Sequence, residues 1–299
     1  MAYLHSDREQ FRDAIDLAYE QTGVMVQAIE KDYYVTMLLR LLAQKMPYIV
    51  FKGGTSLSKC HKVIRRFSED IDITIDTLLS QGQKKKIKQA IVDSAQELGM
   101  TIENLDETRS RRDYNRYVIA YDSVIPMASD ALKAAVLLET SYTAVSFPTV
   151  LLPVHSYIGD MMEQEAPDAI EEYNLNPFEM KVQGIDRTLA DKVFAICDYY
   201  LQGKVAKHSR HLYDIYKLLP LVPQDENFRE LVKEVRAVRA QSVICPSALP
   251  EADVPELLEK IIREKAYKQD YDSLTTQLLE ENVPYDTVIA ALKKVAESS

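Results

Sequence analysis

The chain has 299 residues, 46% of them hydrophobic and 27% charged, so it can bury a large core and is expected to be globular. No apolar run reaches the roughly 20 residues that a membrane span needs, and the first residues lack a signal-peptide pattern. Three cysteines and a net charge of −10 argue against a disulfide framework, a zinc site or binding to nucleic acid through bulk charge. A cytoplasmic protein with reduced thiols is expected.

Two helices are predicted at the N-terminus. Ser6 and Glu9 have the spacing of a capping box, which predicts a first helix with Ser6 as its N-cap. Apolar residues at helical spacing then predict a second, long helix from about Val24 to Lys45, and Pro47 stops it.

A short apolar strand, 48–51, leads into a turn of four small residues: Gly53, Gly54, Thr55 and Ser56. Glycines let the backbone approach a ligand closely, and successive N–H groups can bind an anion. Thr55 or Ser56 can cap a short helix to about Val63, whose dipole favours phosphate. Lys59, one turn further along, can add a charged donor. The turn is therefore predicted to bind nucleotide phosphates, although such turns are also common in structural roles.

Asp70 and Asp72 lie on one face of the next predicted strand, and Ile71, Ile73 and Ile75 lie on the other. Two carboxylates on one face repel each other, which is compensated if they bind a hard cation. Mg²⁺ favours carboxylates together with substrate phosphates. The alternative for an isolated D-x-D pattern is an exposed strand with solvated charges.

The segment after this strand contains a lysine-rich helix, about 82–98, and two further strands at 117–121 and 134–139. It also contains two basic stretches, which are either a local basic surface or ordinary solvated faces. Their members are Lys84, Lys85, Lys86, Lys88, Arg109, Arg111, Arg112 and Arg116.

From about Asp186 the pattern becomes helical, with five predicted helices at 188–201, 209–219, 225–240, 255–268 and 285–296. The predicted fold class is therefore α+β, with a small mixed sheet followed by a largely α-helical C-terminal half. The expected domains are 1–180, including the N-terminal helices, and 181–299.

The order of these elements resembles that of the polymerase-β-like nucleotidyltransferase superfamily. It consists of a strand, a Gly-Gly-Thr-Ser turn, a short helix and a second strand with D-x-D. The wider sequence resembles the AbiEii/AbiGii toxin family, and the similarity extends over roughly residues 28–219. The motifs that carry it are Glu30-Lys31-Asp32-Tyr33-Tyr34-Val35, Phe51 to Lys59, Arg66 to Ile73, Thr188 to Lys192 and His211 to Tyr216.

The resemblance implies roles for two later residues. Lys192 would bind the nucleotide phosphates and stabilise charge in the transition state, and Asp214 would be an active-site carboxylate. In this type of fold a third carboxylate usually completes the metal site. Glu139, at the end of an apolar run, is assigned to that place, and Asp122 is its rival.

The expected function is Mg²⁺-dependent transfer of a nucleoside monophosphate from an NTP to an acceptor. The resemblance implies the toxin of a toxin–antitoxin or phage abortive-infection system, with a cognate antitoxin as a partner. Among acceptors, tRNA or another RNA is favoured over a protein. Two alternatives remain at this point: an inactive nucleotide-binding regulator and a non-enzymatic interaction protein.

Overall fold

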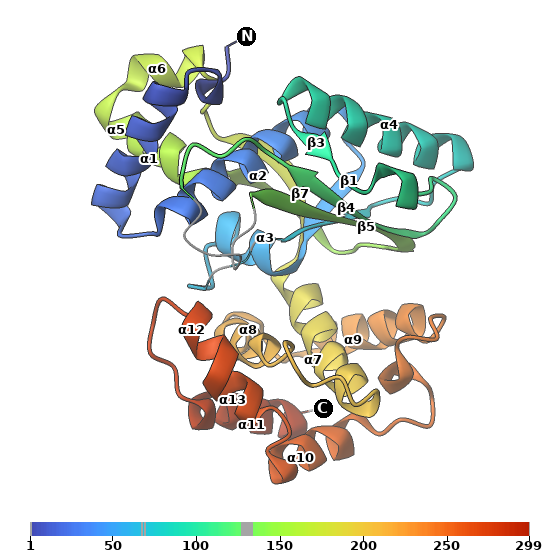
Figure 1. Cartoon of the computed structure of the whole chain (residues 1–299). Helices are drawn as coiled ribbons and strands as arrows, with labels where there is room; N and C mark the ends of the chain where they lie inside the picture. The colour runs from blue at the N-terminus through green and yellow to red at the C-terminus, as the bar shows by residue number, and fades with distance from the viewer. Residues whose placement is uncertain (1, 67, 69, 127–133, 299) are drawn as a thin grey trace. The chain divides into compact units, whose positions relative to one another are not determined.

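The computed structural model describes residues 2–66, 68, 70–126 and 134–298 (Figure 1). The chain forms two compact units. The first, here called the sheet unit, comprises Met1–Cys60 and Ser68–Val182, and the second, the helical unit, comprises His61–Phe67 and Gln183–Ser299. The segment 61–67 therefore leaves the sheet unit between the Gly-Gly turn and the D-x-D strand.

A mixed sheet forms the centre of the sheet unit, and its described strands have the order β3-β4-β5-β2-β1-β7-β6. The central strands are apolar where they face the core: Ile71, Ile73 and Ile75 of β2 are all buried. The strands are β1 (Ile49–Lys52), β2 (Asp70–Ile75), β3 (Thr101–Ile102), β4 (Tyr114–Ala120), β5 (Ala135–Val145), β6 (Thr149–Val154) and β7 (Phe178–Gln183).

Helix α2 (Val26–Lys45) is buried along most of its length, polar residues such as Glu30 and Arg40 included, and it packs against α1, α4 and α5. In Figure 1, α1, α5 and α6 gather near one another while α4 lies beside β3. The other helices of the unit are α1 (Arg8–Thr22), α3 (Gly53–Lys59), α4 (Gln81–Glu97), α5 (Tyr157–Glu165) and α6 (Pro167–Glu172), with 3₁₀ turns η1 (Leu4–Ser6) and η2 (Leu105–Glu107).

The helical unit is built on α7, which contacts α8, α9 and α10, while α13 packs on α8 and α10. Segment 61–67 is fixed to it by backbone groups: the Arg65 N–H donates to Tyr213 Oη, and the Arg65 carbonyl accepts from Glu280 N. Its helices are α7 (Ile185–Leu201), α8 (Arg210–Leu218), α9 (Glu226–Arg239), α10 (Val254–Glu264), α11 (Lys268–Asp270), α12 (Thr276–Leu278) and α13 (Tyr285–Ser298). They are connected by 3₁₀ turns at Leu219–Leu221 and Pro246–Ala248 and by a π-helical turn at Tyr271–Thr275.

The α+β fold class is confirmed, as are the long second helix, the strands before and after the Gly-Gly turn, and the lysine-rich helix. Two local predictions are wrong. Asp7, whose side chain accepts from two backbone N–H groups, caps α1 in place of Ser6. Helix α3 begins at Gly53 and ends at Lys59, so neither Thr55 nor Ser56 is its cap. In the described ranges, no helix is long and apolar enough to cross a bilayer.

Candidate active site

Four charged side chains form a row across adjacent strands of the sheet unit. Asp72 of β2 is in register with Glu139 of β5 on one side and with Lys52 of β1 on the other. Glu139 is in register with Arg116 of β4, and their charged groups lie 3.7 Å apart. Because residues in register on neighbouring strands share a face, this row presents two carboxylates flanked by two cations. Asp70 lies on the same face as Asp72, two residues earlier.

Glu139 is thus better placed than its rival. Asp122 follows the far end of β4, since Ala120 pairs with Ala135 and Arg116 pairs with Glu139. Its carboxylate is exposed and accepts from Arg8 at 2.5 Å. Asp122 therefore makes a surface ion pair, whereas Glu139 lies directly beside Asp72.

Gly53 supports Asp72 through the absence of a side chain. Its φ of +80° is in the left-handed region, and a Cβ placed on it would lie 1.9 Å from Asp72 Oδ2. The Asp72 carboxylate therefore lies against the Gly53 backbone. This explains in physical terms why the turn begins with a glycine, and it couples the turn to the D-x-D strand.

We expect Gly53→Ala to move the Asp72 carboxylate and to lower nucleotide transfer at least about 10-fold, in addition to the backbone cost of about 1–2 kcal/mol for a positive φ. Gly99→Ala is the matched control, because Gly99 has φ +66° and nothing within 4 Å of the added Cβ. Both variants should lose similar stability in urea unfolding. Equal transfer rates in the two variants would show that Gly53 has no role in placing Asp72.

The remaining polar residues of the turn bond to the protein itself. Thr55 Oγ1 is hydrogen-bonded to the Asp70 carbonyl oxygen at 2.5 Å and to Ser68 Oγ at 2.9 Å. Ser56 Oγ donates to the Gly53 carbonyl at 2.9 Å. Thr55 therefore ties α3 to the first residue of the D-x-D strand.

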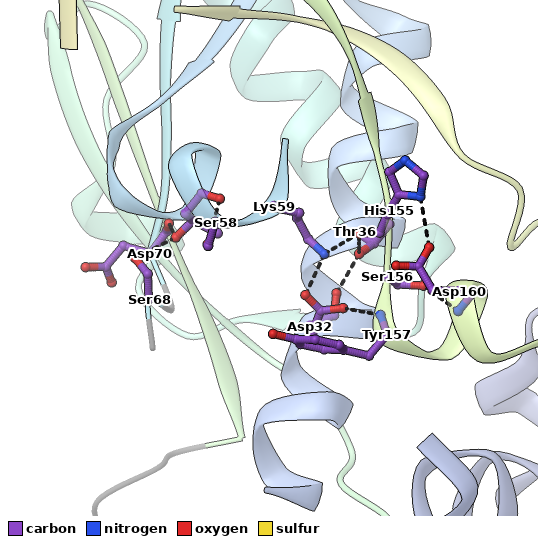
Figure 2. Close-up of polar contacts among 12 residues, drawn as sticks. Asp32, Thr36, Ser58, Lys59, Ser68, Asp70, His155, Ser156, Tyr157 and Asp160 are labelled. Carbon is purple, nitrogen blue, oxygen red and sulfur yellow. Dashed lines mark hydrogen bonds and ion pairs between the residues drawn. The ribbon is translucent and has the colours of Figure 1, made fainter. Parts of the chain in front are cut away.

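Lys59 points away from Asp70, toward α2 and the start of α5 (Figure 2). Its buried ammonium donates to Asp32 Oδ1 at 2.5 Å and to the His155 carbonyl at 2.6 Å. The other carboxylate oxygen of Asp32 accepts from Tyr157 N at 3.0 Å. One ion pair thus joins α2, the end of α3 and the start of α5, and it fixes the orientation of the helix that carries the turn.

We expect Lys59→Met to lower the free energy of unfolding by on the order of 3 kcal/mol, because it leaves the largely buried Asp32 carboxylate without its cation. Lys45→Met removes an exposed pair with Glu97 and should cost less than about 1 kcal/mol. Urea unfolding measures both. A weakened NTP affinity with unchanged stability in Lys59→Met would instead support the phosphate-binding role predicted from sequence.

The helical unit contains a buried cluster of three charges. The Arg66 guanidinium donates to both oxygens of Asp214, at 2.7 and 2.8 Å, and Lys192 Nζ lies 2.7 Å from Asp214 Oδ2. The side chains of Arg66 and Asp214 are 1% and 0% exposed. The structure therefore brings Lys192 and Asp214 together, with one positive charge in excess among the three.

The pKa values of Asp214 and Lys192 in this cluster are both shifted. Burial would raise the pKa of Asp214, but the charges of Arg66 and Lys192 outweigh it and hold the pKa below its usual range. Burial lowers the pKa of Lys192, Asp214 opposes this, and Arg66 adds to the lowering. Since one carboxylate serves two cations, Asp214 is ionised and Lys192 is the group that loses its proton more easily.

His211 belongs to the same cluster, because Lys192 Nζ lies 3.3 Å from its Nδ1. Burial and then the Lys192 charge lower the pKa of His211 well below 6.5. The unfolded chain therefore binds a proton that the folded chain does not, and stability should fall as pH drops below about 6.5.

We expect His211→Gln to flatten the pH dependence of the unfolding free energy between pH 5 and about 6.5. The slope should decrease by up to one proton, or about 1.4 kcal/mol per pH unit. His5, His61 and His208 also have lowered pKa values, mainly through burial, so part of the slope should remain in this variant. Urea unfolding at several pH values measures it, and an unchanged slope would contradict a neutral His211.

Comparison with known proteins gives the family. The sequence model of the nucleotidyl transferase AbiEii toxin family, a type IV toxin–antitoxin system, matches residues 36–292. The chain belongs to the AbiEii toxin family. No curated protein matches its sequence.

A solved structure supports the AbiEii-family fold. The chain is similar to MenT4, a nucleotidyltransferase toxin from Mycobacterium tuberculosis H37Rv, with a TM-score of 0.60 and 18% identity. The match covers 95% of this chain and 88% of MenT4. Membership of this nucleotidyl transferase family makes the chain a nucleotidyltransferase, which removes the non-enzymatic alternative.

Nucleotidyltransferases generally use a divalent metal. Across the described part of this AbiEii-family chain, no three His, Cys, Asp or Glu side chains are arranged to hold a metal alone. Asp72 and Glu139 nevertheless suit a hard cation, because both offer carboxylate oxygens from adjacent register positions on one sheet face. Mg²⁺ characteristically takes one or two carboxylates and completes its shell with water and substrate phosphates.

Three residues with a place in these clusters had no role assigned from the sequence. Lys52 and Arg116 flank the two carboxylates, and Arg66 holds Asp214. Lys52 directly precedes Gly53, so an antiparallel pairing of the two motif strands would have placed it opposite Asp72. For Arg66, the available signal was that it is the first residue of the family-like motif Arg66 to Ile73.

Proposed function

We propose that this protein transfers a nucleoside monophosphate from an NTP to an acceptor and releases pyrophosphate, with Mg²⁺ held by Asp70, Asp72 and Glu139. The observation that carries the proposal is the register of Asp72 with Glu139 beside the Gly-Gly turn, in a chain of the AbiEii family. When bound, the cation would neutralise charge on the phosphates.

The protein's own residues have distinct parts in this proposal. The backbone of the 53–56 turn would bind the triphosphate, and Gly53 leaves room for the Asp72 carboxylate. Lys192 would supply positive charge to the phosphates, which agrees with the excess positive charge of its cluster and with the family motif. Asp214 would hold Lys192 and Arg66 in place. In this view the helical half, 181–299, takes part in the reaction.

For the acceptor we favour the hydroxyl of an RNA, with tRNA first and a protein hydroxyl second. The family is that of a toxin, so the proposal includes a cognate antitoxin that restrains the activity, within the cytoplasm.

The test is to incubate the protein with Mg²⁺, cell lysate and each of the four NTPs, labelled in the α-phosphate. We expect one NTP to label a discrete RNA band that ribonuclease removes. A band removed only by protease would replace RNA by a protein acceptor. Absence of any labelled acceptor with all four NTPs would contradict the proposed transfer.

A further inference from the structure

The two basic stretches of the sheet unit meet in the structure. Lys84 of α4 pairs with Asp113 at 2.5 Å, and Lys88 of the same helix donates to the Thr108 carbonyl at 2.9 Å. These contacts place the first turns of α4 against the loop that leads into β4. We call the combined surface the basic face; its members are Lys84, Lys85, Lys86, Lys88, Arg109, Arg111, Arg112 and Arg116.

The basic face stands out because the whole chain has a net charge of −10. Lysines near a helix N-terminus oppose the helix dipole, and the first turn of α4 contains no acidic residue to offset them. Lys85, Lys86 and Arg111 are exposed, and among the described residues they have no ion-pair partner. Such unpaired cations are available to an external anion. The loop also holds Asp106 and Glu107, and Asp113 neutralises Lys84, so the unpaired positive charge lies on Lys85, Lys86 and Arg111.

The basic face reaches the carboxylate row only through residues 109–116, because α4 packs on the opposite face of the sheet, where Ile87 joins Ile71 in the core. Arg116 is in register with Glu139, and Glu139 with Asp72, so Arg116 lies two strands, or about 10 Å, from Asp72. Tyr114 shares the Arg116 face of β4, is 51% exposed and is hydrogen-bonded to Glu139. An exposed aromatic ring thus lies beside Glu139, on the face of the sheet that carries the two carboxylates.

We propose that the basic face binds the phosphate backbone of the RNA acceptor and that Tyr114 stacks on an unpaired base beside Asp72 and Glu139. A series of cations around this edge of the sheet matches the repeated charges of a polynucleotide, and an exposed aromatic ring matches a base. A protein acceptor would give no reason for combining the two. The inference rests on the proposed function, and it identifies the basic face as the surface that binds the RNA acceptor.

The experiment measures binding of a fluorescently labelled RNA hairpin with a single-stranded 3′ end to the full chain, in EDTA and without NTP. Salt is varied. The variant Lys85→Ala/Arg111→Ala/Arg112→Ala should weaken binding at least 10-fold and should reduce the slope of log K against log salt by about 2, since each phosphate contact contributes roughly 0.7 to 0.9. Tyr114→Leu should weaken binding about 5-fold or more without changing the slope.

The matched control is Arg229→Ala/Lys233→Ala/Lys293→Ala, which removes the same charge from exposed positions of the helical unit. Its RNA binding should equal that of the unchanged chain. If the basic-face variant binds RNA as tightly and with the same salt slope as this control, the inference is overturned.

Nucleotide binding separates this outcome from failure of the proposed function. Equal NTP affinity in the basic-face variant and the unchanged chain, with RNA binding lost only in the former, supports the inference. If the unchanged chain transfers label only to protein and does not bind the hairpin, the basic face is not an RNA surface although transfer stands. If RNA binds through the basic face but no NTP is used, the surface stands and the proposed function fails.

Discussion

Replacing Asp72 with asparagine should lower the rate of nucleotide transfer by at least about 100-fold, the effect of losing a principal electrostatic element of an active site. The amide is nearly isosteric, so the change removes charge and little volume. Stability should change little, because the relieved repulsion from Glu139 and the lost attraction to Lys52 oppose each other. Initial transfer rates and urea unfolding of the same protein preparation measure both effects.

Asp76→Asn is the matched control. Asp76 is the acidic residue that directly follows β2, and it is ion-paired with Lys181. It should therefore retain nearly full transfer activity. Full activity in Asp72→Asn, or an equal loss in both variants, would remove the carboxylate row from the reaction.

Asp214→Asn should lower the free energy of unfolding by about 3–5 kcal/mol, because it leaves the buried Arg66 and Lys192 without their carboxylate. Lys192→Met should cost much less stability, since Asp214 keeps both hydrogen bonds from Arg66. Transfer should nevertheless fall at least about 100-fold in Lys192→Met, if its charge acts on the phosphates.

The control for this pair is Asp198→Asn. Asp198 is also buried in the helical unit, where it accepts from Arg239 and Ser247. Its loss should destabilise the unit by a similar amount while leaving the rate per folded molecule unchanged. If Lys192→Met transfers nucleotide at the normal rate, Lys192 is a structural residue, and the surplus charge of its cluster has another purpose.

Local patterns predicted the parts of the fold that they determine. Strand β2 alternates with a period of 2 residues and helix α2 has apolar residues at helical spacing, and both were predicted. Strand β6 was not predicted, since Pro153 within it argues against a strand and only an edge position tolerates it. Strand β3 has two residues and no detectable period.

The sequence predicted those site residues that lie together in one contiguous motif. It did not predict those whose neighbours are determined by tertiary contacts. Asp70 and Asp72 share a face because of strand geometry alone. That Glu139 lies beside Asp72 follows from strand order, which the sequence pattern does not contain. Lys59 and Arg66 are charged residues within motifs, yet only the packing around them decides that their charges are buried in ion pairs.

The central claim is transfer of the nucleotidyl group, and the position of the label in the NTP tests it most directly. The protein is incubated with total RNA, Mg²⁺ and NTP labelled in either the α- or the γ-phosphate, with Asp72→Asn in parallel. The account predicts that α-label appears in RNA in an amount equal to the pyrophosphate released, that γ-label appears only in pyrophosphate, and that Asp72→Asn gives neither. Transfer of the γ-label to an acceptor, or equal α-labelling by Asp72→Asn, would contradict it.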